Sequence, residues 1–588
     1  MTAPQDVYEP LPLYRDVFRE SFRNNAEEFF GALKDRSGID TEANAKTAAE
    51  TREAEARLAG EESARAAWGW GIGFSVAALA AAVLGAGSVI SDDGDPGVLA
   101  AIAVGAILVL WFMIGLCIPR RRAHADAANA ERARVEELKA LAWSQMAPLN
   151  ALFDWDAPAK IIGKTVPALK FDPFFTEGRL AELHDSFGWD DSFNDGKSVL
   201  GAHSGEINGN PFVFARLLQM GWGLKIYSGS RTVSWTELER GADGKMRMVH
   251  RSQTLTATVS KPIPEYSEDV ILIYGNDAAP NLCFTREPSS LSSAGDGFFG
   301  RLRKNGAIKS LERFSRNLDD EYGYTIMGNR EFEALFETKD RSDEVEYRLL
   351  FTPLAQKQML ELIKDREIGF GDDFSFEKRR KINIIRADHL RQADLDTDPA
   401  KFADFDFQAA HGKFVGFCEQ FFKSTWFALA PLLSIPLYSQ TRTHENIYKG
   451  IIDRRSCFWE HESLANYLGE KRFRHPDSVT RNILKTRIAN RDGDVATLEV
   501  TASGFRTVRR VDAVSVTANN GRSYLVEVPW DEYLPVSRTS PVHATEREGL
   551  SLTEFRTALQ TSEDWQAFFR NWNADSARAA FRRSIVSF

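Results

Sequence analysis

The sequence lacks the residues and motifs that mark most secreted, metal-binding and nucleotide-hydrolysing proteins. Its 588 residues include only four cysteines, too scattered for a disulfide framework or a CxxC zinc module: Cys117, Cys283, Cys418 and Cys457. No GxxxxGK[ST] phosphate loop, strand-linked GxGxxG, GxSxG elbow, HExxH or kinase motif occurs. These absences argue against the common ATPases, hydrolases and zinc proteases, and they leave an unfamiliar enzyme open.

The charge balance of the chain argues against nucleic acid as a partner. Lys and Arg number 73 against 83 Asp and Glu, which gives a net charge of -10. Proteins that coat nucleic acid are usually basic, and the alternation of aromatic and basic residues expected of a base-stacking platform is also missing. We therefore expect no nucleic-acid partner.

Charge is also missing from two long stretches near the N-terminus. No charged residue lies between Arg65 and Asp92 or between Asp95 and Arg120, and these gaps hold 26 and 24 residues. A membrane-spanning helix needs about 20 apolar residues, so we predict transmembrane helices over residues 68–90 and 96–118. A buried hairpin of a soluble protein is the alternative, but core helices rarely stay free of charge for this length.

The charges around the two predicted spans indicate their orientation. The short link between the spans is acidic, whereas the outer flanks are basic: Arg57, Arg65, Arg120, Arg121, Arg122, Arg132 and Arg134. The positive-inside rule then predicts a multi-pass protein of the inner membrane with both termini in the cytoplasm. Small residues at Gly73, Ala77, Ala81 and Gly85 predict close packing of the two spans, or self-association through the same face.

Each span is flanked on its cytoplasmic side by a strong helix former. Segments 40–66 and 123–149 are rich in Ala, Glu and Arg. We predict that each span continues as one long helix, so that residues 40–152 form an antiparallel, coiled-coil-like stalk about 35–40 Å long on the cytoplasmic side. Residues 1–39 precede it with an amphipathic helix over 11–33, which packs on the body of the protein, on the membrane or in a partner's groove.

The rest of the chain predicts an α+β protein with β-rich and mixed α/β cytoplasmic modules. Residues 153–288 are β-rich, 289–325 form a linker and a basic helix, and 326–485 are mixed, with a strand at 347–351 and helices at 355–364 and 409–433. Residues 486–540 form a second β-rich module, in which Asn519-Asn520-Gly521 predicts a hairpin turn. Residues 546–588 close the chain with two predicted helices.

Two groups of residues are candidate binding sites. The basic helix carries Arg301, Arg303, Lys304, Lys309 and Arg313, which suit anionic lipid headgroups if they are not simply a solvated face. The second group, Cys457, His461, His444 and His475, has the donor types that zinc prefers, and Cys457 and His461 share a helical face. Its spacing matches no familiar zinc module, so we expect no cofactor, with zinc as the alternative to an ordinary packed helix.

Several short blocks resemble a known family. Phe332–Phe336, Glu346–Pro353 and Met359–Leu362, together with Gly205–Phe212 upstream, are similar to blocks of a bacterial membrane-protein family of unknown function that carries a galanin-like label. The resemblance covers roughly residues 60–390. It implies two adjacent N-terminal spans and a large cytoplasmic portion, and it supplies no catalytic residue.

These observations favour a membrane-anchored scaffold or adaptor that presents a binding surface away from the bilayer. We expect membrane lipid and a protein partner, or a second copy, as its contacts. Two other functions stay open: a membrane-tethered enzyme with an unrecognised, metal-assisted site, and a sensor of lipid or envelope stress that uses the basic helix.

Overall fold

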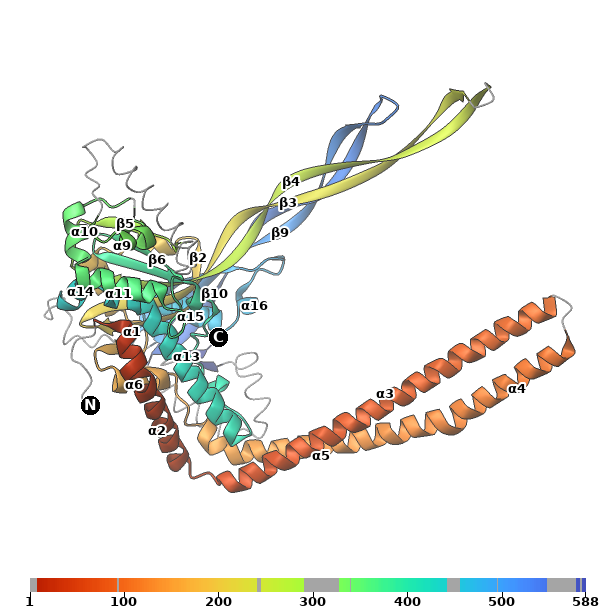
Figure 1. Cartoon of the computed structure of the whole chain (residues 1–588), viewed down its shortest axis with the longest axis horizontal. Helices are drawn as coiled ribbons and strands as arrows, with labels where there is room; N and C mark the ends of the chain where they lie inside the picture. Colours follow the sequence, from red (N-terminus) through yellow and green to blue (C-terminus); the bar gives the residue numbers. More distant parts are fainter. Residues whose placement is uncertain are drawn as a thin grey trace.

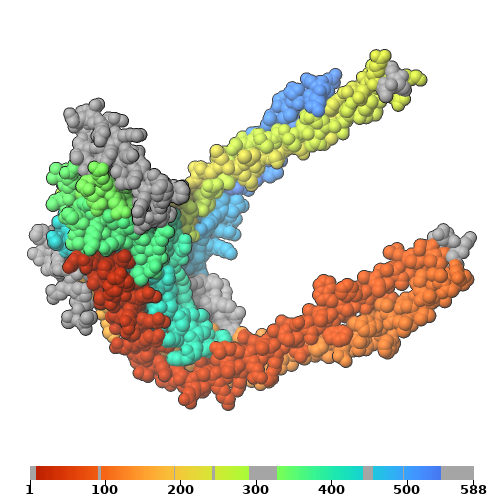
Figure 2. Space-filling model, in the orientation of Figure 1, coloured from red at the N-terminus to blue at the C-terminus, as the bar shows by residue number. Residues whose placement is uncertain are grey.

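The protein consists of a body from which two long arms project, one helical and one built of β-strands (Figure 1). The computed structural model describes residues 8–91, 95–240, 245–289, 327–338, 340–441, 455–493, 495–546, 578–581 and 584–587. Both arms leave the body toward the same side, and the space-filling view shows open space between them (Figure 2). The fold is α+β, as predicted.

The N-terminal segment packs into the body. Helix α1 (Pro10–Leu13), a single π-helical turn (Tyr14–Phe18) and α2 (Arg19–Ser37) lie against the long helix α13 (Phe407–Leu433). The Phe22 ring stacks on Phe422 with centroids 4.4 Å apart, and Phe18 meets Trp426 at 5.1 Å. The amphipathic face predicted for residues 11–33 therefore belongs to the protein's own core, and the two other interpretations of this face are wrong.

The helical arm is the predicted hairpin. Helix α3 (Thr41–Ser91) runs outward, and α4 (Pro96–Phe112), the π-helical turn η2 (Met113–Cys117) and α5 (Ile118–Asn150) return without a break. At this turn Ile118 N–H bonds five residues back to Met113 O. Pro119, which has no N–H to donate, follows directly. Helix α5 ends within three residues of Pro148, close to the predicted stop.

A seven-stranded antiparallel sheet forms the centre of the body. Its order is β1-β2-β3-β4-β7-β6-β5, and its strands are β1 (Leu169–Phe171), β2 (Lys197–Ile207), β3 (Asn210–Arg240), β4 (Met246–Gly275), β5 (Cys283–Arg286), β6 (Phe374–Arg379) and β7 (Ile382–Ala387). The strands come from segments 153–288 and 326–485, which the sequence analysis kept apart. One sheet and one hydrophobic core join these segments.

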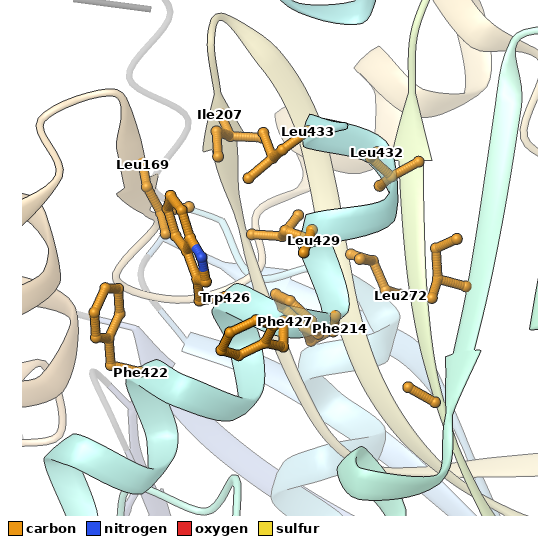
Figure 3. Packing of buried hydrophobic residues seen from close by; sticks show 14 of the residues in the cluster. Leu169, Ile207, Phe214, Leu272, Phe422, Trp426, Phe427, Leu429, Leu432 and Leu433 are labelled. Carbon is orange, nitrogen blue, oxygen red and sulfur yellow. The ribbon is translucent and has the colours of Figure 1, made fainter. Parts of the chain in front are cut away.

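The core of the body lies between this sheet and helix α13. Figure 3 shows Leu429 of α13 on the side of Phe214 of β3 and Leu272 of β4, whereas Trp426 of the same helix lies beside Leu169 and Phe422. Most of the apolar segment 425–438 is buried here, and it ends in α14 (Pro436–Gln440). The remaining helices of two or more turns that surround the core are α6 (Ala157–Thr165), α7 (Glu177–Phe187), α11 (Pro353–Lys364) and α15 (Phe458–Tyr467).

Shorter helices include one that the sequence analysis assigned as a strand. Residues 347–350 lie in α10 (Glu344–Leu350), next to α9 (Arg330–Phe336), and Phe351 is the C-cap residue of α10, so this run is not a strand. The side chain of Asp343 accepts hydrogen bonds from the N–H groups of Val345 and Glu346, both at 2.9 Å. This N-cap starts a helix and overrides the β-propensity of the following apolar residues. Two further short helices are α12 (Asp388–Gln392) and α16 (Glu470–Phe473).

The second sheet is also antiparallel. Its three long strands are β8 (Ile483–Asp492), β9 (Val495–Thr517) and β10 (Ser523–Glu546), with short strands β12 (Ser584–Ser587) and β11 (Arg578–Phe581) at its edge. The predicted turn joins β9 to β10, with Gly521 at φ 78°. The second of the two helices predicted for residues 546–588 is wrong at its end, because the β-branched pair Ile585-Val586 lies in β12, which pairs with β10.

Candidate membrane hairpin and stalk root

The outer half of the helical arm is covered with exposed apolar side chains. Trp70 and Phe74 on α3 are each 71% exposed, and Trp111 on α4 is 72% exposed. Soluble proteins rarely leave apolar surface of this extent in water. Both helices of the arm are long and apolar enough to cross a membrane.

The two helices meet along a seam that differs from the predicted one. Ser75 is buried, and a Cβ on Gly71 would lie 3.3 Å from the sulfur of Cys117 on the opposite helix. Gly73, Ala77 and Ala81 are instead exposed on the outside of the hairpin. Residues four apart drift around a helix by about 40° per step, so a stripe of such residues does not follow a seam for long. The prediction that these three residues pack the two spans against each other is wrong, and self-association through them stays a prediction.

Below the apolar band the two helices are joined by ion pairs. Glu61 bonds His124 at 2.6 Å, Glu62 bonds Arg132 at 2.6 Å, and Glu55 pairs with Lys139 at 2.5 Å. Such half-exposed pairs contribute little stability individually. They do mark a water-exposed stalk that begins where the apolar surface ends.

Two buried asparagines clamp this stalk to the body. Asn44 of α3 donates from Nδ2 to Phe405 O at 2.8 Å and accepts from Phe407 N–H at 2.9 Å. Asn150 of α5 holds Asp404 in the same way, with its Nδ2 donating to Asp404 O at 3.0 Å. Both asparagines are 1% exposed. We call these two residues the stalk clamp.

The loop held by the stalk clamp, residues 402–406, leads directly into α13. Phe407 N–H belongs to the first turn of that helix and has no partner within the helix, so Asn44 caps the central helix of the body from outside. Trp143 and Lys139 of α5 pack on the ring of Phe405, with centroid distances of 6.2 and 5.7 Å. Arg52 of α3 also pairs with Asp406. The base of the arm is thus fixed to the helix that organises the core.

The predicted metal ligands are only partly brought together. Cys457 is the N-cap residue of α15, and its carbonyl accepts from His461 N–H at 3.2 Å. Both residues are buried, whereas the imidazole of His475 is 34% exposed and lies 3.9 Å from Asp477. His444 lies outside the described residues, as do Arg301, Arg303, Lys304, Lys309 and Arg313. Within the described part of the chain, no group of three His, Cys, Asp or Glu side chains is arranged to hold a metal ion.

The same helix carries a buried ion pair that sequence reasoning missed. Glu462 is fully buried, pairs with Lys485 of β8 at 2.8 Å and accepts from Val199 N–H of β2 at 3.0 Å. Burial raises the pKa of Glu462, although Lys485 opposes that shift. The pair connects the two sheets through α15, so its role is to hold these elements together. Its only sequence signal was a carboxylate among the apolar residues of a helix.

A second feature missed from the sequence is a polar cavity of about 400 Å³ beside α12, lined by Phe370, Asp373, Asp388, His389, Gln392, Ala393 and Gln420. His389 stacks on Phe370 at 4.0 Å, its Nδ1 bonds Asp373 at 2.5 Å and its Nε2 bonds Ser424 O at 3.0 Å. Both imidazole nitrogens therefore have protein partners. In this arrangement neither nitrogen is free to take a proton from a ligand in the cavity.

Comparison of the chain with protein families, with curated proteins and with solved structures finds no match. The resemblance to the galanin-like membrane family therefore stays a prediction.

Proposed function

We propose that the hairpin crosses the bacterial inner membrane and that the body and both termini lie in the cytoplasm. The exposed apolar band supports the first part of this proposal. The orientation rests on charge, because Arg65 and Arg120 lie at the body end of the band, whereas Asp95 lies at the turn. Trp68, with Arg120 over its ring at 5.6 Å, suits the interface nearest the body.

We further propose that the protein is a scaffold or adaptor that presents its body and β arm at a set distance from the bilayer. The stalk clamp is the observation that carries this proposal. From Thr41 to Trp68 the stalk is about 40 Å long at 1.5 Å per residue, and hydrogen bonds and buried contacts fix its base. An anchor that only held the protein at the membrane would need neither the rigid stalk nor the clamp.

The first experiment separates anchoring from partner binding. Helices α1 and α2 belong to the core, so removing residues 1–150 would strip buried Phe18 and Phe22 and unfold the body. The better variant lacks only residues 67–120, with a short Gly-Ser link closing the shortened stalk. Full-length protein should stay in the membrane pellet after carbonate washing, whereas the variant should be soluble.

Affinity capture of both forms then tests the scaffold. The same stoichiometric protein should be recovered with the full-length protein, in mild detergent, and with the soluble variant. Recovery of full-length protein in the soluble fraction would refute the anchor. A body that captures no protein in either form would refute the scaffold and favour the enzyme or sensor alternatives.

The orientation has its own test. An impermeant maleimide added to intact spheroplasts should label Asp95→Cys at the turn, and it should label Arg134→Cys on the stalk only after lysis. Both side chains are exposed. The reverse pattern would place the body outside the cytoplasm.

A further inference from the structure

The β arm consists of two hairpins packed face to face. Beyond Met220, β3 and β4 leave the body as a two-stranded ribbon, and β9 and β10 cover one face of it. The buried residues between the hairpins include Tyr227, Leu255, Val526 and Val528. The backbones approach so closely that a Cβ on Gly229 would lie 2.1 Å from the carbonyl oxygen of Glu527. This packing assigns the odd-numbered residues of the ribbon to its inner face.

Between Trp222 and Leu238, and on the facing part of β4, the outer face of the ribbon carries no acidic residue, lysine or arginine, and Arg240 follows only at its far end. On β3 the even positions from 222 to 238 read Trp, Leu, Ile, Ser, Ser, Thr, Ser, Thr, Leu. On β4 the even positions from 248 to 264 read Met, His, Ser, Thr, Thr, Thr, Ser, Pro, Pro. Charged residues make up 27% of the chain, so about five would be expected among these positions on a solvated face.

This face is nevertheless open in the described structure. Leu224 is 74% exposed, and Ile226 and Met248 are each 71% exposed. The outer face of the neighbouring ribbon is a useful contrast, because there Arg509 pairs with Asp531 at 3.1 Å in the ordinary manner of a solvated strand pair. Depletion of charge together with exposed Trp, Leu, Ile and Met is typical of the buried centre of a protein interface.

We propose that the outer face of the β3–β4 ribbon binds the same face of a second copy of this chain. The face has an apolar end at Leu224 and Ile226, a hydroxyl-rich middle around Thr232 and Thr254, and an apolar end at Leu238 and Met248. Trp222, at the base of the ribbon, already packs on the ring of Phe505 of β9 at 5.2 Å. The hydroxyls already pair across the strands, as in the 3.1 Å contact between Thr232 and Thr254. Because the pattern is the same from either end, it is complementary to itself under a two-fold axis, which is the geometry of most homodimers.

The size of the face fits this partner. From Trp222 to Leu238 the ribbon extends about 53 Å at 3.3 Å per residue and is about 10 Å wide. It therefore offers roughly 500 Å² per copy and about 1,000 Å² in a pair, which is where specific interfaces begin. A face that lay on lipid would place its central serines and threonines in the hydrocarbon, where each hydroxyl could use only part of its hydrogen-bonding capacity, at an energetic cost. A second copy provides hydroxyl partners at those positions.

The test uses full-length protein in mild detergent with Cys283 replaced by Ser, since that thiol is half-exposed. Thr232→Cys should cross-link to a second copy with a short bis-maleimide. Leu224→Cys and Leu238→Cys distinguish a parallel from an antiparallel arrangement of the two ribbons. If the ribbons run parallel, each variant cross-links to a second copy of itself. If they run antiparallel, a cross-link forms only when the two variants are mixed. Ser515→Cys, exposed on the outer face of the β9–β10 ribbon, is the control and should not cross-link.

A second variant tests the interface without a thiol at its centre. Thr232→Glu places two carboxylates opposite each other in the dimer. Added to the Leu224→Cys protein, or to both members of the Leu224→Cys and Leu238→Cys mixture, it should reduce cross-linking at least tenfold. Ser515→Glu, added in the same way, should not reduce it. Thr232 is exposed in one copy, so the substitution leaves the fold intact, as circular dichroism will show. Cross-linking at the level of the Ser515→Cys control would overturn the proposal. Quenching of a fluorophore at residue 226 by spin-labelled lipid would also overturn it and assign the face to the membrane.

Discussion

Replacing Asn44 by Ala should loosen the base of the stalk. The substitution removes two short hydrogen bonds, at 2.8 and 2.9 Å, and a longer one of 3.4 Å to Gln145 Oε1, and it leaves Phe405 O and Phe407 N–H without partners in a poorly hydrated place. A typical bond contributes about 1 kcal/mol net, and stranding a buried group costs about 1–3 kcal/mol, so we expect a local loss of about 2–4 kcal/mol. Since 1.4 kcal/mol corresponds to about a factor of ten, the clamped loop should open at least about 30 times more often.

Hydrogen exchange measured by mass spectrometry reports this opening directly. The amide of Phe407 should exchange at least about 30-fold faster in Asn44→Ala than in the parent protein, by the energies above. Asn129→Ala, exposed on the same stalk, is the matched control and should leave this amide unchanged. Asn150→Ala should have a smaller effect, because its second hydrogen bond is long, at 3.4 Å. Exchange at Phe407 that differs from the control by less than about threefold would refute the clamp.

Three further outcomes are expected. Gly229→Val should force the two hairpins of the β arm apart at Glu527 and increase proteolysis of the arm, whereas exposed Ser228→Val should not. Burial raises the pKa of Asp398 from 3.8 to about 6. Between pH 4 and 6 the native protein therefore holds a proton that the unfolded chain has lost, so the free energy of unfolding falls as pH rises. In thermal melts, Asp398→Asn should remove that fall and stabilise the protein at pH 8. Burial lowers the pKa of Lys378 from 10.5 to about 7. Between pH 7 and 10 the unfolded chain binds a proton that the native protein does not, so the free energy of unfolding should rise with pH. Lys378→Met should flatten this rise, and an unchanged slope of stability against pH would contradict the assignment.

The helical arm was predictable because its signals are local. A charge-free stretch between Arg65 and Asp92 and an alanine-rich flank each point to a helix without reference to the rest of the chain. The turn at Asn519–Gly521 and the buried helix α13 were predictable for the same reason. Only the contact surface between the two spans was assigned to the wrong face of the helix. That surface depends on which residues of the opposite helix pack against it.

The body was harder to predict because its contacts connect distant segments. Strands β6 and β7 come from residues 374–387, yet they complete a sheet begun at residue 169. Short apolar runs such as 347–351 fit a helix or a strand equally well, and there the N-cap Asp343, four residues before the run, decided between them. The stalk clamp could not be predicted at all, since an asparagine at position 44 gives no sign of a partner at position 405.

The lengths of the two arms together limit how the protein can stand beneath a membrane. If a bilayer surrounds the apolar band, about 40 Å of clearance separates it from the base of the stalk. The ribbon from Met220 to Arg240 is longer, about 66 Å at 3.3 Å per residue, and it leaves the body toward the same side (Figure 1). For the tip of the ribbon to stay clear of the headgroups, the ribbon must lean away from the membrane normal or the hairpin must tilt in the bilayer. The tilt of the ribbon and the depth of the hairpin in the bilayer are therefore coupled, so that raising one changes the other.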